Sequence, residues 1–136
     1  MISHLRLIWH VLGWLWVAVI FYLSLVPSPP QPVNFPSADK IEHALAYCLL
    51  MLWFCQVCLQ RLSRIRLAVM LITMGIAIEF MQGATGYRTF DYADMLANAA
   101  GVMVGWLLAA TGMVNIYKFI ERYLSSRLGK TKLNQN

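Results

Sequence analysis

Residues 7–26 read LIWHVLGWLWVAVIFYLSLV, a run without a charged side chain that directly follows Arg6. A helix of about 20 residues, at about 1.5 Å per residue, spans the hydrocarbon core of a bilayer. A cleavable signal peptide is the alternative, but the apolar core is long, it contains Trp9, Trp14 and Trp16, and no Ala-x-Ala-like cleavage site follows it. We therefore interpret the run as an uncleaved first membrane-spanning helix.

The composition of the whole chain favours the same class of protein. Of the 136 residues, 60% are hydrophobic and 12% are charged, whereas a typical soluble domain has about 25% charged residues. The net charge of +5 would suit nucleic acid only if a soluble domain displayed a basic face, and no such domain fits in the chain. All the cysteines, Cys48, Cys55 and Cys58, fall in one apolar run, so we interpret the Cys-x-x-Cys spacing as apolar packing rather than as a redox or metal motif.

Further apolar runs predict an all-α, polytopic domain with four transmembrane helices. After the first helix, the runs cover residues 41–59, 67–83 and 93–113. All five prolines lie within residues 27–38, which predicts an extended loop outside the membrane because proline blocks helix formation. Residues 83–90 predict a polar turn. The transmembrane domain would occupy residues 1–113 and a basic tail residues 114–136, and we expect the end of that tail, residues 129–136, to be disordered.

The lysines and arginines are divided unevenly between the two sides that four spans would create. Nine of them fall on the side of the N-terminus, the middle loop and the tail: Arg6, Arg61, Arg64, Arg66, Lys118, Arg122, Arg127, Lys130 and Lys132. Only Lys40 and Arg88 fall on the other side. Basic residues mark cytoplasmic segments, so we predict that both ends are cytoplasmic and that the protein lies in the inner (cytoplasmic) membrane. The aromatic and basic residues of the segment 116–128 suit either a helix on the inner leaflet or a solvated tail.

Most of the acidic residues collect at the predicted outer ends of the second, third and fourth spans. The polar residues of this cluster are Asp39, Glu42, His43, Tyr47, Glu79, Gln82, Arg88, Asp91, Asp94 and Asn98. Ionisable side chains within spans are costly, and they usually face a bundle interior or a water-filled cavity. We therefore expect these side chains to converge in a polar pocket beneath the outer surface.

Helical spacing supports this convergence. The polar residues share one face of each span with small residues: Asp39, His43 and Tyr47 on the second, Gly75, Glu79 and Gln82 on the third, and Asp91, Asp94, Asn98, Gly101 and Gly105 on the fourth. Ala97, Gly101 and Gly105 form a small-xxx-small pattern, which allows helix backbones to approach closely. The face that carries the polar residues is therefore also predicted to be the packed face.

Several of these residues could instead have a structural role. Asp39 with Glu42, and Asp91 with Asp94, are spaced for capping the starts of helices. Glu79 is the hardest to explain in this way, because it lies near the C-terminal end of a helix, where the dipole opposes a carboxylate.

The remaining polar residues also have structural alternatives. Arg88 could simply neutralise Asp91 or Glu79 by pairing with one of them. His43 could be a hydrogen-bonded core histidine, and Tyr47 an interfacial aromatic residue.

The same residues form motifs. The first helix ends Ser24-Leu-Val-Pro27, the second begins Asp39-Lys40-x-x-His43-x-x-x-Tyr47, and Glu79-x-x-Gln82-x5-Arg88-x-x-Asp91-x-x-Asp94-x-x-x-Asn98-x-x-Gly101 follows. In these motifs the chain resembles the VanZ-like family, which is named for a teicoplanin-resistance protein. The resemblance covers about residues 7–108. The resemblance implies a small membrane protein or membrane module with these residues at its site. It makes a role in antibiotic resistance possible, but it does not imply that this protein confers resistance.

Two functions fit the predicted site. In the first, the pocket at the outer leaflet binds an envelope lipid, a lipid-linked head group or a lipoglycopeptide. The planar fork of Arg88 would pair with a phosphate or carboxylate. The other predicted ligand-binding residues are Asp91, Asn98, Gln82, Tyr47 and Asp39. The partners would be membrane lipids or lipid-linked envelope components, and not nucleic acid.

The alternative is a membrane-embedded enzyme that acts on envelope lipids. Its catalytic residues would be Glu79, His43 and Asp94. Glu79 and His43 could exchange protons with a lipid substrate, or His43 with two carboxylates could hold a divalent metal ion. One histidine without a paired histidine motif is a weak metal signal, so we predict no metal and no cofactor. Ion passage is disfavoured, since the inner halves of the helices carry few polar residues.

Overall fold

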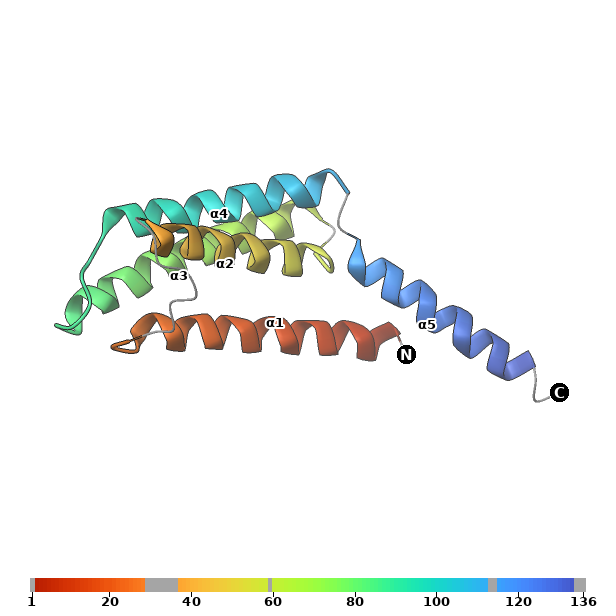
Figure 1. The fold of residues 1–136 in the computed structure, drawn as a ribbon. Coiled ribbons are helices and arrows are strands. Elements are labelled where there is room, and N and C mark those ends of the chain that lie inside the picture. Colours follow the sequence, from red (N-terminus) through yellow and green to blue (C-terminus); the bar gives the residue numbers. More distant parts are fainter. Residues whose placement is uncertain (1, 29–36, 59, 113–114, 134–136) are drawn as a thin grey trace.

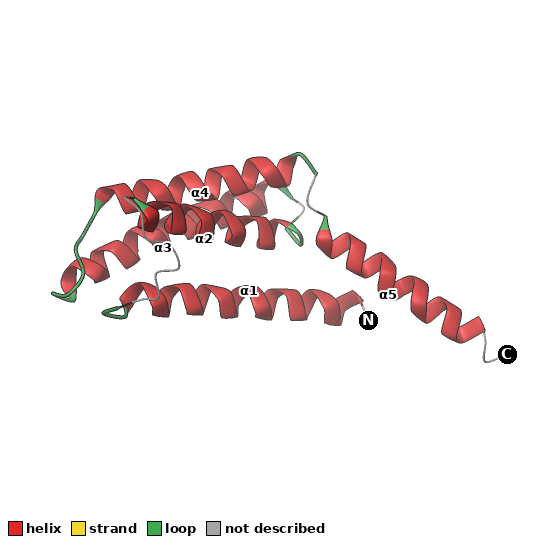
Figure 2. Cartoon of the chain, in the orientation of Figure 1, coloured by secondary structure: helices red, strands yellow, loops and turns green. Residues whose placement is uncertain are grey.

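The computed structural model describes residues 2–28, 37–58, 60–112 and 115–133, and these residues form helices and short connections (Figures 1 and 2). The helices are α1 (Ile2–Leu25), α2 (Ala38–Cys55), α3 (Arg61–Ala84), α4 (Tyr92–Ala110) and α5 (Ile116–Leu133). The all-α prediction is therefore confirmed for the part of the chain that is described. Most of the predicted proline loop, residues 29–36, lies outside it.

The predicted helix ends need several corrections. α2 begins before the predicted residue 41 and ends at Cys55 rather than at residue 59. α3 begins at Arg61, six residues before the predicted start, because the basic segment joins the helix. α4 ends at Ala110 rather than at residue 113, and Gly112 follows with a positive φ of 70°. The prediction that residues 129–136 are disordered was wrong for residues 129–133, which continue α5, while residues 134–136 lie outside the described part.

Among the described residues, three helical segments are long and apolar enough to cross a membrane: His4–Leu25, Arg61–Ala84 and Tyr92–Ala110. They indicate a membrane protein. Their outward faces carry large apolar side chains, such as Leu7 on α1, Val69 on α3 and Leu107 on α4, each more than half exposed. α2, the remaining predicted span, has 18 residues, and its first turns hold Asp39, Lys40 and Glu42. These charges lower its mean hydropathy, and α2 is not among the three candidate spans.

α2 lies against α4, and glycine makes their close contact possible. A Cβ atom at Gly101 would lie 2.1 Å from the carbonyl oxygen of Ala44, and one at Gly105 would lie 2.5 Å from that of Cys48. The close approach predicted from the small-xxx-small pattern is therefore confirmed. α3 packs against α4 and also contacts α2. The core between these helices contains the fully buried side chains of Leu50, Met51, Leu71 and Val102.

The cysteines take part in this packing. Cys48, Cys55 and Cys58 are free thiols, the first two buried and the third partly buried. The predicted apolar role fits this placement.

α1 runs beside the other helices (Figure 1). Hydrogen bonds attach it to them near its two ends. Near its start, the indole nitrogen of Trp9 donates to the carbonyl oxygen of Trp53 at 2.9 Å, and the indole nitrogen of Trp53 donates to that of Trp9 at 3.0 Å. The two rings stack with centroids 4.1 Å apart. At its end, the carbonyl oxygens of Ser24 and Leu25 accept hydrogen bonds from side chains at and after the end of α3.

Candidate functional site

The start of α2, the end of α3 and the start of α4 meet at one end of the bundle (Figure 1). Polar side chains from all three helices extend from this end into the bundle. We call this group the polar column, and it comprises Asp39, Lys40, His43, Tyr47, Glu79, Asp91, Asp94 and Asn98.

Lys40 is the centre of the outer part of the polar column. Its ammonium nitrogen lies 2.7 Å from Oδ2 of Asp91, 3.0 Å from Oδ1 of Asp94 and 3.1 Å from Oδ2 of Asp39. The cation thus joins the first turn of α2 to the start of α4. Lys40 holds the pKa of the Asp91 carboxyl below its usual value, chiefly through this hydrogen bond.

Lys40 was not among the predicted site residues, although it stands in the motif that opens α2. The balance of charges in the sequence could have indicated its role. Five acidic residues were predicted to lie at this end of the bundle, and Lys40 and Arg88 are the only basic residues near them in the sequence. At least one of the two cations had to neutralise the carboxylates.

The capping alternative holds for one of the residues to which it was applied. Asp91 is the N-cap of α4, and its Oδ1 accepts from the backbone nitrogen of Ala93 at 2.8 Å. Asp91 therefore caps a helix and binds Lys40 at the same time. The N-cap of α2 is Ser37, so the alternative in which Asp39 with Glu42 forms the cap does not hold, although Asp39 lies in the first turn, where the helix dipole favours a carboxylate.

His43 lies one turn deeper and is engaged at both ring nitrogens. Nδ1 is 3.2 Å from Oδ1 of Asn98, and Nε2 is 3.9 Å from Oδ2 of Asp94. The first distance is a hydrogen bond, and the second is a longer electrostatic contact. Two residues of α4 thus fix the ring orientation of a histidine on α2.

Glu79 closes the column from α3. Its Oε1 accepts from the backbone nitrogen of Asp91, so the carboxylate ties the end of α3 to the N-cap of α4. The residue is 1% exposed, and its Oε2 has no hydrogen-bond partner among the described residues. A buried carboxylate oxygen without a partner is costly. Glu79 thus has a structural contact through Oε1, while its second oxygen has no part in that contact.

Tyr47 and Asn98 form the inner end of the column, and each is 2% exposed. The hydroxyl of Tyr47 also lacks a hydrogen-bond partner among the described residues. Gly75 of α3 provides the space beside them, since a Cβ there would lie 3.0 Å from Nδ2 of Asn98 and 3.2 Å from the hydroxyl of Tyr47.

Exposure falls steadily along the column from the end of the bundle to its interior. The side chain of Asp39 is 49% exposed, that of Lys40 31% and that of Asp94 13%, whereas Asn98 and Glu79 are almost completely buried. The polar side chains of the column therefore extend from the surface to two buried oxygen atoms that have no partner among the described residues, Oε2 of Glu79 and the hydroxyl of Tyr47. Within the described residues, no group of three or more His, Cys, Asp and Glu side chains is arranged to hold a metal ion.

Two predicted site residues lie apart from the column. Nε2 of Gln82 donates to the carbonyl oxygen of Ser24 at 2.7 Å, so this buried side chain attaches α3 to α1. Arg88 lies in the connection between α3 and α4 and is partly buried. Its guanidinium forms no ion pair with any described residue, so the alternative in which Arg88 neutralises Asp91 or Glu79 by pairing with one of them does not hold there; Lys40 takes that part at Asp91.

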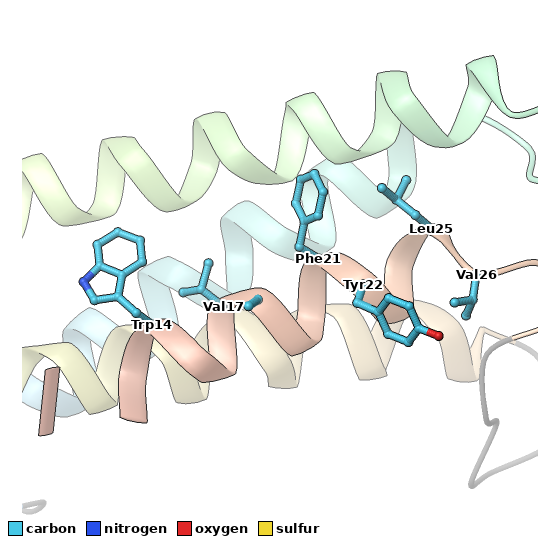
Figure 3. Close-up of a pocket in the computed structure, with 7 residues that line it drawn as sticks. Trp14, Val17, Phe21, Tyr22, Leu25 and Val26 are labelled. Carbon is cyan, nitrogen blue, oxygen red and sulfur yellow. The ribbon is translucent and has the colours of Figure 1, made fainter. Parts of the chain in front are cut away.

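A second feature of this half of the molecule is an apolar groove of about 490 Å³ along α1 (Figure 3). The lining residues are Trp14, Val17, Ala18, Phe21, Tyr22, Leu25 and Val26. Phe21 and Leu25 point from α1 toward α3. The groove contains no charged side chain, so it is distinct from the polar column.

Comparison with known proteins gives one family for most of the chain. A family model described as VanZ/LLP1 matches residues 5–115. The uncharacterized protein C11E3.10 of Schizosaccharomyces pombe is 33% identical over 90 residues, which are 64% of this chain and 53% of that protein. The chain thus spans about half the length of this curated relative.

No solved structure matches the chain. The matched segment of the family model contains the whole polar column and helices α2, α3 and α4, together with nearly all of α1. The chain belongs to the VanZ/LLP1 family.

Proposed function

We propose that this protein is a four-span inner-membrane protein, with both ends in the cytoplasm, whose polar column binds the head group of an envelope lipid, a lipid-linked envelope component or a lipoglycopeptide. In this proposal α2 is the fourth span. Its charged first turn is accommodated because Lys40 neutralises carboxylates of α2 and α4, and its apolar remainder packs against α4. The nine basic residues on one side support the orientation.

The observation that carries the proposal is that Oε2 of Glu79 and the hydroxyl of Tyr47 lie together at the inner end of the column, buried and without a hydrogen-bond partner among the described residues. Two other buried oxygen atoms share this property, Oε1 of Glu42 in the first turns of α2 and the hydroxyl of Tyr117 on α5. Buried polar atoms are normally hydrogen-bonded, so each exception requires an explanation. A hydroxyl or amine of a ligand, or a water that the ligand displaces, would supply the missing hydrogen bonds. The partly exposed carboxylates above them, Asp39 and Asp91, would bind donors nearer the surface.

Charge distribution indicates how an anionic head group would be held. Lys40 is already surrounded by three carboxylates, so it offers little attraction to a phosphate. Arg88 has no ion pair among the described residues, and a guanidinium binds phosphate or carboxylate with two parallel hydrogen bonds. We therefore assign the anion to Arg88 and the hydroxyl or amine groups of the ligand to the column.

A specific observation keeps the enzymatic alternative in view. The Glu79 carboxylate is buried, and its Oε2 has no hydrogen-bond partner among the described residues. This arrangement would suit a general acid or base. His43 is hydrogen-bonded to Asn98 through Nδ1, and its Nε2 lies 3.9 Å from Oδ2 of Asp94, which favours a positioning role for His43 over proton transfer.

The test measures lipid binding to the purified, full-length protein by native mass spectrometry, with phosphatidylglycerol as the probe. We expect Arg88→Ala to weaken binding about 10- to 100-fold, the range for a lost hydrogen bond to a charged group. Arg66→Ala, an exposed arginine at the other end of α3, is the matched control and should bind as the wild type does. Unchanged binding in Arg88→Ala would remove the assigned anion site.

Glu79→Gln separates the two functions, because it keeps the shape of the side chain and removes the charge. A binding protein should retain graded binding in this variant, whereas an enzyme should lose turnover of an envelope lipid while still binding it. The topology requires its own test. A reporter fused after Asn136 should be active only as a cytoplasmic reporter, and a periplasmic signal would overturn the orientation.

A further inference from the structure

Helix α5 carries an uncovered apolar face. Its exposed apolar side chains include Ile116 (54% exposed), Phe119 (72%) and Tyr123 (52%). Residues three, four and seven positions apart lie on one side of a helix, so these side chains form a single stripe. Lys118, which is exposed, is on the opposite side, and Arg122, also exposed, borders the stripe one turn after Phe119.

The position of α5 relative to the bundle is fixed at its first turn. Tyr117 is 5% exposed, and its ring meets that of Trp9 edge to face with centroids 5.5 Å apart. Trp9 in turn stacks on Trp53. This contact lies where α1 begins and α2 and α4 end, which is the end of the bundle opposite the polar column (Figure 1). From there α5 extends away from the bundle.

We infer that α5 lies on the membrane surface and binds acidic phospholipids. Its apolar stripe would enter the boundary between head groups and acyl chains, while its cations would contact the phosphates. Charge complementarity selects this partner: Lys118 and Arg122 are followed in the sequence by Arg127, Lys130 and Lys132, and Glu121 is the only acidic residue of the helix.

Continuity with the bundle supports the same partner. The candidate span α4 ends at Ala110, only a few residues before α5 begins, so the first turn of α5 must lie near the membrane boundary. Aromatic residues such as Phe119 and Tyr123 are typical of that boundary. The inference is independent of the ligand of the polar column, which lies at the other end of the bundle.

The experiment uses the full-length chain in vesicles of phosphatidylcholine alone or of equal parts phosphatidylcholine and phosphatidylglycerol. In a background without the native cysteines, checked for unchanged thermal unfolding, one variant carries a fluorophore at Tyr123→Cys and its matched control at Ser125→Cys. These positions are two residues apart and on opposite sides of the helix. Lipids with a quencher near the head group should quench the first label strongly and the second weakly, and only when phosphatidylglycerol is present.

The role of charge is tested by Lys118→Ala combined with Arg122→Ala. Each cation near an acidic membrane strengthens binding about fivefold, so the ratio of docked to undocked helix should fall about 25-fold. Equal quenching at the two positions would overturn the inference, and so would quenching that is the same in vesicles with and without phosphatidylglycerol. Energy transfer between labels on two chains, without quenching by lipid, would also overturn it and would identify a second copy as the partner. The variant Glu79→Gln should leave the quenching unchanged.

Discussion

Adding one methyl group at Gly101 tests whether the contact between α2 and α4 holds the polar column together. The new Cβ atom of Gly101→Ala would lie 2.1 Å from the carbonyl oxygen of Ala44 and 2.9 Å from its carbonyl carbon. An ordinary carbon–oxygen contact is about 3.3 Å, so the two backbones must separate by roughly 1 Å. The obstacle is main chain, which cannot move aside as a flexible side chain does.

The same separation would act on the column. His43 and Asn98 are 3.2 Å apart, and Lys40 and Asp94 are 3.0 Å apart. A shift of roughly 1 Å takes both pairs beyond hydrogen-bond distance. Overpacking alone costs about 1–3 kcal/mol, while alanine gains about 1 kcal/mol over glycine in a helix. With the lost hydrogen bonds included, we expect a net loss of about 2 kcal/mol.

The assay is reversible unfolding in mixed detergent micelles, followed by circular dichroism. Val104→Ile is the matched control, because it also adds one carbon to α4 but at a half-exposed position away from the contact. It should change the free energy of unfolding by less than about 0.5 kcal/mol. If Gly101→Ala unfolds at the same detergent composition as the wild type, the close contact does not constrain the helices and the reasoning fails.

Two further predictions concern the outer part of the polar column. Lys40→Met should destabilise the protein by about 1–2 kcal/mol, because three carboxylates lose their common cation at a partly exposed position; a variant as stable as the wild type in the same unfolding assay would contradict the central role of Lys40. The pKa of Asp91 is lower in the folded protein than in the unfolded chain, where it is about 4. The ionised Asp91 carboxylate therefore stabilises the fold fully at pH values above about 4, and this stabilisation is lost as the pH falls through the lower pKa of the folded protein. Thermal unfolding from pH 7 to pH 3 should therefore show a decline below about pH 4 that is smaller in Asp91→Asn, which keeps the helix cap.

The sequence carries much of the information about which residues face the interior. Gly75, Glu79, Asn98, Gly101 and Gly105 were predicted to lie on packed faces, and all are buried. The reason is geometric, since residues spaced by three and four positions share a helix face whatever the neighbouring helices do. Close approach at the glycines followed from the same spacing.

Pairings between helices were harder to predict, because they depend on how each helix is rotated and on where long side chains reach. Lys40 has Asp39 beside it in the sequence, yet two of its three partners come from α4. Gln82 shares a face with Glu79, but its amide turns to the backbone of α1. No local pattern distinguishes these outcomes, since each side chain can reach several partners.

The prediction that α2 ends at residue 59 was wrong, because an apolar run shows where a segment is hydrophobic but not where the helix ends, which is at Cys55. Apolar composition continues past Cys55, but backbone hydrogen bonds there change to tighter turns at Gln56 and Val57. Hydrophobicity therefore extended the prediction to residue 59, beyond the true end of the helix.

The way in which α1 is attached has a consequence for how its sequence can vary. Trp9 and Trp53 receive hydrogen bonds at their carbonyl oxygens, and so do Ser24 and Leu25, the last two residues of α1. The final carbonyls of a helix have no partner within it, and every amino acid offers the same carbonyl. Replacement of the side chains at positions 24 and 25 therefore leaves these acceptors in place, so exchanges between homologues there need no compensating change at Gln82. Methods that infer contacts from correlated substitutions should consequently find little signal between position 24 and Gln82, even though the two residues are hydrogen-bonded.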